Sequence, residues 1–128
     1  KANIVNEGND LTIITYGLGV HWALELLNQI DCSLEIIDLR TLIPLDKEMI
    51  FASVKKTGKV LILHEDCMTG GFGSDISSLI SENCFEFLDA PIFRCSSLDT
   101  PVPFSNDLEK NFLAKSRLKQ KVVELSLY

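Results

Sequence analysis

The apolar run Val-Leu-Ile-Leu at residues 60–63 is the feature that most constrains what this chain can fold into. Four consecutive apolar residues leave no polar side for water, which is typical of a strand buried on both faces of a parallel sheet. Neighbouring parallel strands need a crossover connection, usually a helix, so the sequence around this run has to alternate between strands and helices.

Strand-like and helix-like segments do alternate along the chain. β-branched and apolar residues predict further strands at 11–16, 34–39 and 92–95. Helical spacing predicts helices behind Gly17, between the N-cap Asp46 and the C-cap Gly58, and over residues 72–84, with one or two more at 107–127 after the proline segment 99–104. We therefore expect an α/β fold of three layers, α/β/α, with an open and mostly parallel sheet, formed by residues 1–128 as a single domain.

Composition indicates an ordinary globular domain, with 46% hydrophobic and 23% charged residues. No apolar run approaches the roughly 20 residues of a membrane helix, and no signal sequence opens the chain. We expect a cytoplasmic protein with no membrane partner. Because the first residue is Lys1 and not methionine, we also expect the sequence to be part of a longer chain.

The net charge of -6 argues against a nucleic-acid partner, because a phosphate backbone would be repelled. One basic cluster stands out, formed by Lys110, Lys115, Arg117, Lys119 and Lys121. Its apolar neighbours recur at helical spacing, so we interpret it as the solvated side of a C-terminal amphipathic helix.

The four cysteines form no CxxC pair, and with two histidines they show no zinc-ligand spacing. Cys32, Cys84 and Cys95 are expected to be buried as small hydrophobic residues. Cys67 differs because it lies in the polar stretch His64–Cys67, directly before a glycine-rich turn.

Three segments follow predicted strands and should meet at one edge of the sheet, where open α/β folds usually bind ligands. They are Gly17–Gly19, Arg40–Leu45 and His64–Gly73. The first lacks the third glycine of a dinucleotide motif, since Trp22 stands at that position, so a plain tight turn is favoured.

The glycines at 70–73 open a helix whose N-terminus is able to hold an anion, but Asp75 already places a negative charge in its first turn. We expect these glycines to permit close approach of a neighbouring domain or chain. Before them, residues alternate between the two sides of an extended segment, so His64 and Cys67 face opposite ways and a Cys-His dyad is not expected.

Several stretches together resemble one family. They are TYGLGVHWAL at 15–24, EIIDLRTLIPLD at 35–46, VKKTGKVLILHED at 54–66, TGGFG at 69–73 and LDTPVPF at 98–104. In this order they are similar to the C-terminal domain of the β chain, or of the β part of an α-β fusion, in the E1 component of thiamine-diphosphate-dependent 2-oxoacid dehydrogenases.

The resemblance implies a transketolase C-terminal type of fold and a non-catalytic role in an enzyme of the 2-oxoisovalerate or pyruvate dehydrogenase type, with branched-chain substrates favoured. Thiamine diphosphate and magnesium would be bound by other domains, so no cofactor is expected in this chain. The implied active-site rim or interdomain contacts are Arg40, His64, Glu65, Gly70, Gly71 and Gly73.

The implied partners are other E1 domains, paired across a two-fold axis, and the peripheral-subunit-binding domain of the E2 acyltransferase. Asp89 and Tyr128 are the residues that the resemblance suggests for E2 docking. Two alternatives stay open: a free-standing Rossmann-like domain that binds a nucleotide or anion at one of its glycine turns, and a domain of transketolase or deoxyxylulose-phosphate synthase.

Overall fold

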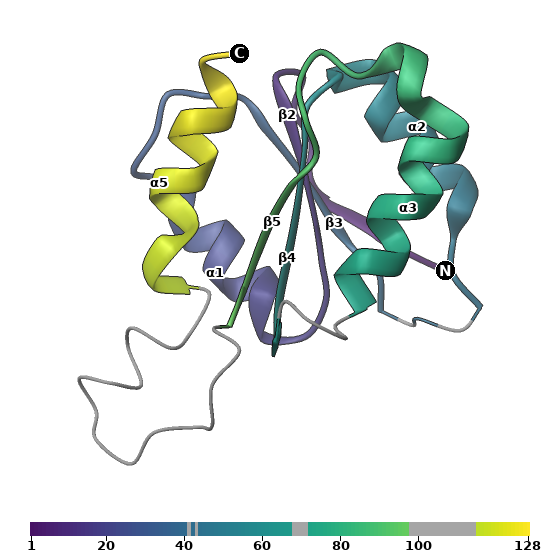
Figure 1. Cartoon of the computed structure of the whole chain (residues 1–128). Coiled ribbons are helices and arrows are strands. Elements are labelled where there is room, and N and C mark those ends of the chain that lie inside the picture. Colours follow the sequence, from purple (N-terminus) through teal and green to yellow (C-terminus); the bar gives the residue numbers. More distant parts are fainter. Residues whose placement is uncertain (41, 43, 68–71, 98–114) are drawn as a thin grey trace.

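The computed structural model describes residues 1–40, 42, 44–67, 72–97 and 115–128. The strands are β1 (Asn3–Asn6), β2 (Leu11–Thr15), β3 (Leu34–Asp38), β4 (Val60–Cys67) and β5 (Phe93–Ser97). The helices are α1 (Leu18–Leu26), α2 (Lys47–Thr57), α3 (Phe72–Cys84), the 3-10 turn η1 (Phe85–Phe87) and α5 (Lys115–Ser126). The predicted alternation of strands and helices is confirmed (Figure 1).

The five strands form one sheet in the order β1-β3-β2-β4-β5. β3, β2, β4 and β5 are parallel to their neighbours, as predicted. β1 is antiparallel to β3 and lies at the sheet edge, with Ile4 opposite Ile37. The sequence did not predict this strand, because four residues with two asparagines carry little strand signal of their own.

The sheet separates two apolar cores, which gives the three layers that the sequence predicts. α1 and α5 cover one face, and α2 and α3 cover the other (Figure 1). Trp22 packs into the core under α1 and α5, together with Leu11, Leu61 and Leu118. Full burial of one large apolar side chain contributes about 1.5–3 kcal/mol.

No helix in the described ranges is long and apolar enough to cross a bilayer.

β4 extends beyond the apolar run that identified it. The structure places its end at Cys67, four residues after Leu63, because Cys67 still aligns with Ser97 of β5. The register between β4 and β5 shifts between Leu63 and Cys67, so His64 and Glu65 belong to the strand but lie in an irregular part of it.

Helix α2 begins and ends as its sequence predicts. The Asp46 side chain accepts a hydrogen bond from the Met49 backbone N at 3.2 Å, which caps the first turn. Gly58 ends the helix with φ of 74°, and its N–H donates to the Val54 carbonyl at 2.8 Å. Both signals are local, so they can be recognised without knowledge of the fold.

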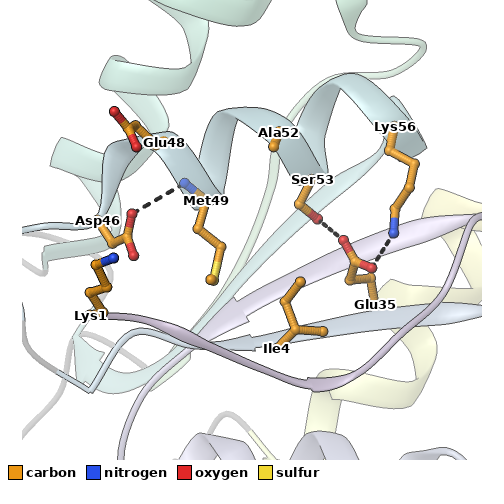
Figure 2. A pocket seen from close by; sticks show the side chains of 9 residues that line it. All are labelled: Lys1, Ile4, Glu35, Asp46, Glu48, Met49, Ala52, Ser53 and Lys56. Atoms are coloured by element: carbon orange, nitrogen blue, oxygen red, sulfur yellow. Dashed lines mark hydrogen bonds and ion pairs between the residues drawn. The ribbon is translucent and has the colours of Figure 1, made fainter.

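A buried polar network joins α2 to the sheet (Figure 2). Glu35 of β3 is 1% exposed, and its carboxylate accepts hydrogen bonds from Ser53 Oγ at 2.6 Å and from Lys56 Nζ. Thr12 Oγ1 lies 2.8 Å from Ser53 Oγ and 2.7 Å from Thr57 Oγ1, which extends the network to β2. A groove of about 460 Å³ opens beside it, between β1 and α2.

The charge on Glu35 is retained although the residue is buried. Burial by itself raises the pKa of this carboxyl, but the hydrogen bonds from Lys56, Ser53 and the Gly8 backbone N outweigh it and lower the pKa below its usual value. Glu35 therefore stabilises the fold above the pKa of the unfolded state, and this contribution is lost as the pH falls through the folded-state pKa.

We predict that Lys56→Met lowers the free energy of unfolding at pH 7 by about 1–3 kcal/mol, because it leaves a buried carboxylate without its cation while the exposed part of Lys56 limits the loss. Chemical denaturation at pH 7 and at pH 3.5 measures this. The difference between wild type and variant should shrink as the pH is lowered, because protonation of Glu35 removes the buried charge that Lys56 compensates. Lys47→Met, at an exposed position of the same helix, is the control and should change stability little at either pH. An equal loss in both variants would contradict the role assigned to the buried carboxylate.

Candidate functional site

The carboxyl ends of the parallel strands bring the predicted loop residues to one edge of the sheet. The Leu39 N–H donates to the Thr15 carbonyl at 2.9 Å, which holds the ends of β3 and β2 together. A Cβ atom placed on Gly17 would lie 3.9 Å from Glu65 Oε1, so the turn after β2 faces the end of β4. The expectation that these three loops are neighbours in space is confirmed for their described residues.

His64 and Gly73 form the tightest contact at this edge. His64 is 1% exposed, and Gly73 lies in the first turn of α3, directly against its imidazole ring. A Cβ atom at position 73 would come within 2.8 Å of His64 Cδ2 and closer still to Nε2. Gly73 is therefore required by close packing, and His64 is an interior residue and not a solvent-facing base.

Glu65 points away from His64, as the alternation along a strand requires. His64 is buried while Glu65 is exposed at the edge beside Gly17. The side chains of Asp66 and Cys67 lie outside the described residues, as do Gly70 and Gly71. Within the described part, the stretch thus offers one interior imidazole and one exposed carboxylate, and these two groups do not converge on a common point.

The backbone of Arg40, at this edge of the sheet, has an unusual conformation. Among the described residues it is the non-glycine residue with positive φ, at 60°, a conformation that side chains with a Cβ rarely adopt. Its N–H donates to Asp38 Oδ1 at 3.0 Å, which stabilises the turn. The side chain is exposed where β3 ends, so a guanidinium is presented at the same edge as Glu65.

The described residues do not fit a phosphate or a metal ion at this edge. Asp75 lies in the first turn of α3, where it occupies the positive end of the helix dipole. No group of three histidine, cysteine, aspartate or glutamate side chains in the described ranges is arranged to hold a metal. No step of chemistry through a diphosphate or a magnesium ion follows from these residues.

Asp89 and Tyr128 lie at the opposite end of the sheet. Asp89 follows η1, is exposed, and donates its N–H to the Gly58 carbonyl at 2.8 Å. It shares a groove of about 510 Å³ with Asp10, Asp31 and Ser126. Tyr128 is 62% exposed and packs edge-to-face on Phe93, with ring centroids 6.0 Å apart. The two residues are therefore separated by the length of the strands from the edge that carries Arg40 and Glu65.

The cysteines are poor nucleophiles where the structure describes them. Cys84 and Cys95 are buried, as predicted, and Cys32 is half-buried. Burial raises the pKa of all three thiols, to about 11 for Cys95. Thiol chemistry near neutral pH is not favoured at these positions.

Comparison with known families identifies the fold. The family model described as "Transketolase, C-terminal domain" matches residues 1–117. The chain belongs to the transketolase C-terminal domain family. This confirms the resemblance found in the sequence, and the α/β/α fold agrees with it.

Curated relatives of this transketolase C-terminal domain are β subunits of 2-oxoacid dehydrogenases. It is 44% identical over 117 residues to the 2-oxoisovalerate dehydrogenase subunit beta of Bacillus subtilis (strain 168), covering 88% of the chain and 36% of the relative. Identity is 49% over 107 residues with the protein of the same name from Pseudomonas aeruginosa, covering 84% and 31%. The pyruvate dehydrogenase E1 component subunit beta of Rickettsia felis is 43% identical over 115 residues, covering 86% and 35%. The chain thus spans about a third of the length of these relatives.

Solved structures show the same fold in larger chains. A split gene transketolase, described as an inactive beta4 tetramer, superposes with a TM-score of 0.82 at 24% identity, covering 99% of this chain and 41% of that one. A 2-oxoglutarate:ferredoxin oxidoreductase from Magnetococcus marinus gives a TM-score of 0.56 at 15% identity, covering 98% and 19%. At such identities the likeness concerns the fold alone.

Sequence reasoning missed the network around Glu35. The glutamate lies between the apolar residues Leu34 and Ile36, and a charge in such a run is itself a signal that a partner is needed. Finding that partner required the tertiary structure, because Ser53 and Lys56 come from a helix that begins twelve residues after Glu35.

We predict that Gly73→Ala lowers the free energy of unfolding by about 1–3 kcal/mol, because the added methyl group collides with the buried His64 ring. Thermal and denaturant unfolding measure the change. Ser78→Ala, at an exposed position of α3, is the matched control and should be neutral or slightly stabilising. In the double variant with His64→Ala, the cost of the alanine at 73 should be smaller than in the wild type. Additive losses would show that the two residues do not compete for space.

Proposed function

We propose that this chain serves as the C-terminal domain of the β component in a 2-oxoacid dehydrogenase E1, which decarboxylates a 2-oxo acid oxidatively and transfers the acyl group to the lipoamide of E2. The observation that carries this proposal is the identity of 44% and 49% with two 2-oxoisovalerate dehydrogenase β subunits over more than four fifths of the chain. Since these relatives act on 2-oxoisovalerate by name, we propose a branched-chain 2-oxo acid as substrate.

In this proposal the domain is non-catalytic. Thiamine diphosphate and magnesium would be held by other domains of the parent enzyme. Two features support this division. His64 is interior, and the negative charge of Asp75 in the first turn of α3 repels an anion at that helix end. The isolated chain is therefore expected to bind no thiamine diphosphate in calorimetry and to decarboxylate no 2-oxo acid.

The edge that carries Arg40, Glu65 and Gly73 is proposed to form the rim of the active-site region and to contact other E1 domains. The exposed guanidinium and carboxylate offer polar contacts, and the glycine lets α3 approach the strand closely. Gly70 and Gly71 belong to the same proposal by their place in the sequence. The proposal also includes pairing of β-type domains across a two-fold axis and a cytoplasmic location.

The opposite end of the sheet is proposed to dock the peripheral-subunit-binding domain of E2. Asp89 supports this assignment because it is exposed beside two further carboxylates, Asp10 and Asp31, and a basic module is attracted to such a surface. Tyr128 has a different environment. The ring centroid of its partner Phe93 also lies 5.9 Å from Lys121 Nζ, so a cation packs on the ring that Tyr128 contacts.

An exchange experiment tests the proposed function. The 117 matched residues of the Bacillus subtilis β subunit are replaced by the corresponding residues of this chain, and the hybrid is assembled with its E1 partner subunit. We expect an assembled enzyme that oxidises 2-oxoisovalerate in the presence of E2. A hybrid that folds but does not assemble would contradict the proposal.

For docking, we predict that Asp89→Lys in this hybrid weakens E2 binding by about tenfold or more, because a carboxylate facing a basic module becomes a cation. Titration calorimetry with the E2 peripheral-subunit-binding domain measures the affinity. Glu48→Lys, at an exposed position of α2, makes the same charge change elsewhere and should leave it unaltered. Unchanged affinity in Asp89→Lys would remove this residue from the docking surface without affecting the assignment of the domain.

A further inference from the structure

The side chain of Phe85 is the most exposed aromatic group among the described residues. It is 75% exposed and lies in the 3-10 turn η1, directly after α3. The neighbouring Phe87 has a partner, because Lys55 Nζ lies 5.1 Å from the centroid of its ring. No ring or cation contact of this kind involves Phe85 within the described ranges. Covering the Phe85 ring would therefore remove a large apolar surface from water.

A groove of about 660 Å³ lies beside Phe85, between α3 and the segment that leads to β5 (Figure 1). Ser77 and Ser81 of α3 line one wall of this groove. The other wall is mainly apolar and is formed by Leu88, Ala90, Pro91 and Ile92. An apolar groove next to an exposed ring is suited to receive a large apolar side chain of a partner.

Main-chain hydrogen bonds hold the turn that carries Phe85. The Leu88 N–H donates to the Phe85 carbonyl at 3.1 Å, and the Asp89 N–H donates to the Gly58 carbonyl at 2.8 Å. The side chains of Leu88 and Ile92 also pack against the core under α2 and α3. The ring is thus presented from a fixed backbone. A partner that covers it has few further groups to order, which favours binding.

The charges around this groove are negative. Glu86 and Asp89 line it, and no lysine or arginine is among the described residues that do so. Ser81 places the C-terminal end of α3 beside the groove, and the last turn of this helix carries no basic side chain against the negative end of its dipole. A cationic partner is attracted to this surface, and an acidic partner is repelled.

We propose that this groove docks a basic segment of a partner protein, which inserts a large apolar side chain beside Phe85 and places lysine or arginine side chains near Glu86 and Asp89. The apolar contact supplies affinity, and the carboxylates select for basic flanks. Pairing of the groove with that of a second copy is disfavoured, because it brings four carboxylates together. Asp89 also borders the acidic groove at Asp10 and Asp31, but the other residues of the two grooves differ. The proposal does not depend on the parent enzyme.

The experiment titrates the ¹⁵N-labelled 128-residue chain with an acetylated and amidated hexapeptide that has leucine and phenylalanine in the middle and two lysines on each side. We expect amide shift changes confined to residues 77–92, with an affinity that falls as salt is added. Two control peptides have glutamate in place of lysine, or serine in place of the two apolar residues, and should bind about tenfold more weakly or less. An absence of shift changes, changes elsewhere, or equal binding of either control peptide would overturn the proposal.

Variants test the ring and the charge separately. Phe85→Ser should weaken binding of the lysine peptide about tenfold or more, because it removes the apolar anchor. Phe87→Ser makes the same change in the same turn, but Phe87 does not line the groove, so the affinity should stay unchanged. Glu86→Gln should weaken binding about threefold. Equal affinity of wild type and Phe85→Ser would overturn the docking site, and equal affinity of wild type and Glu86→Gln would overturn the selection of a basic segment.

Discussion

The complete burial of β2 is the constraint on which the rest of the structure depends. All five of its residues, Leu11–Thr15, are buried, with β3 on one side and β4 on the other. A strand in this position needs an apolar cover on both faces, so the chain has to cross repeatedly from one face to the other. The helical crossovers produce two separate cores and leave the ends of the strands as the places where polar side chains gather.

The same constraint makes interior polar groups depend on one another. Thr12 stands in the central strand and Glu35 in its neighbour, and both face α2. Water does not reach them, so the helix has to supply Ser53, Lys56 and Thr57 at positions that satisfy the carboxylate and the hydroxyl together. The position of α2 on the sheet is thereby fixed by polar contacts as well as by the apolar core.

Much of the fold was predictable from sequence because its signals are local. The apolar run of β4, the cap at Asp46 and the glycine at 58 each act within a few residues, and all three predictions were confirmed. The strand β1 and the last residues of β4 were not predicted, because they are held by pairing with distant strands. The outcome at the sites follows the same division. Strand alternation correctly separated His64 from Glu65, while the contact between His64 and Gly73, and the position of Asp89 at the opposite end of the sheet from Arg40, depend on packing.

The basic helix α5 on an otherwise acidic chain gives the molecule a permanent electric dipole. In the field of a charged neighbour such a dipole experiences a torque, so the domain turns toward a preferred orientation before any contact is made. The effect reaches about one Debye length, roughly 8 Å at physiological ionic strength, and shortens as salt is added. Productive encounters then form a larger share of all collisions than for a uniformly acidic surface, and the ionic strength of the surroundings sets how large that share is.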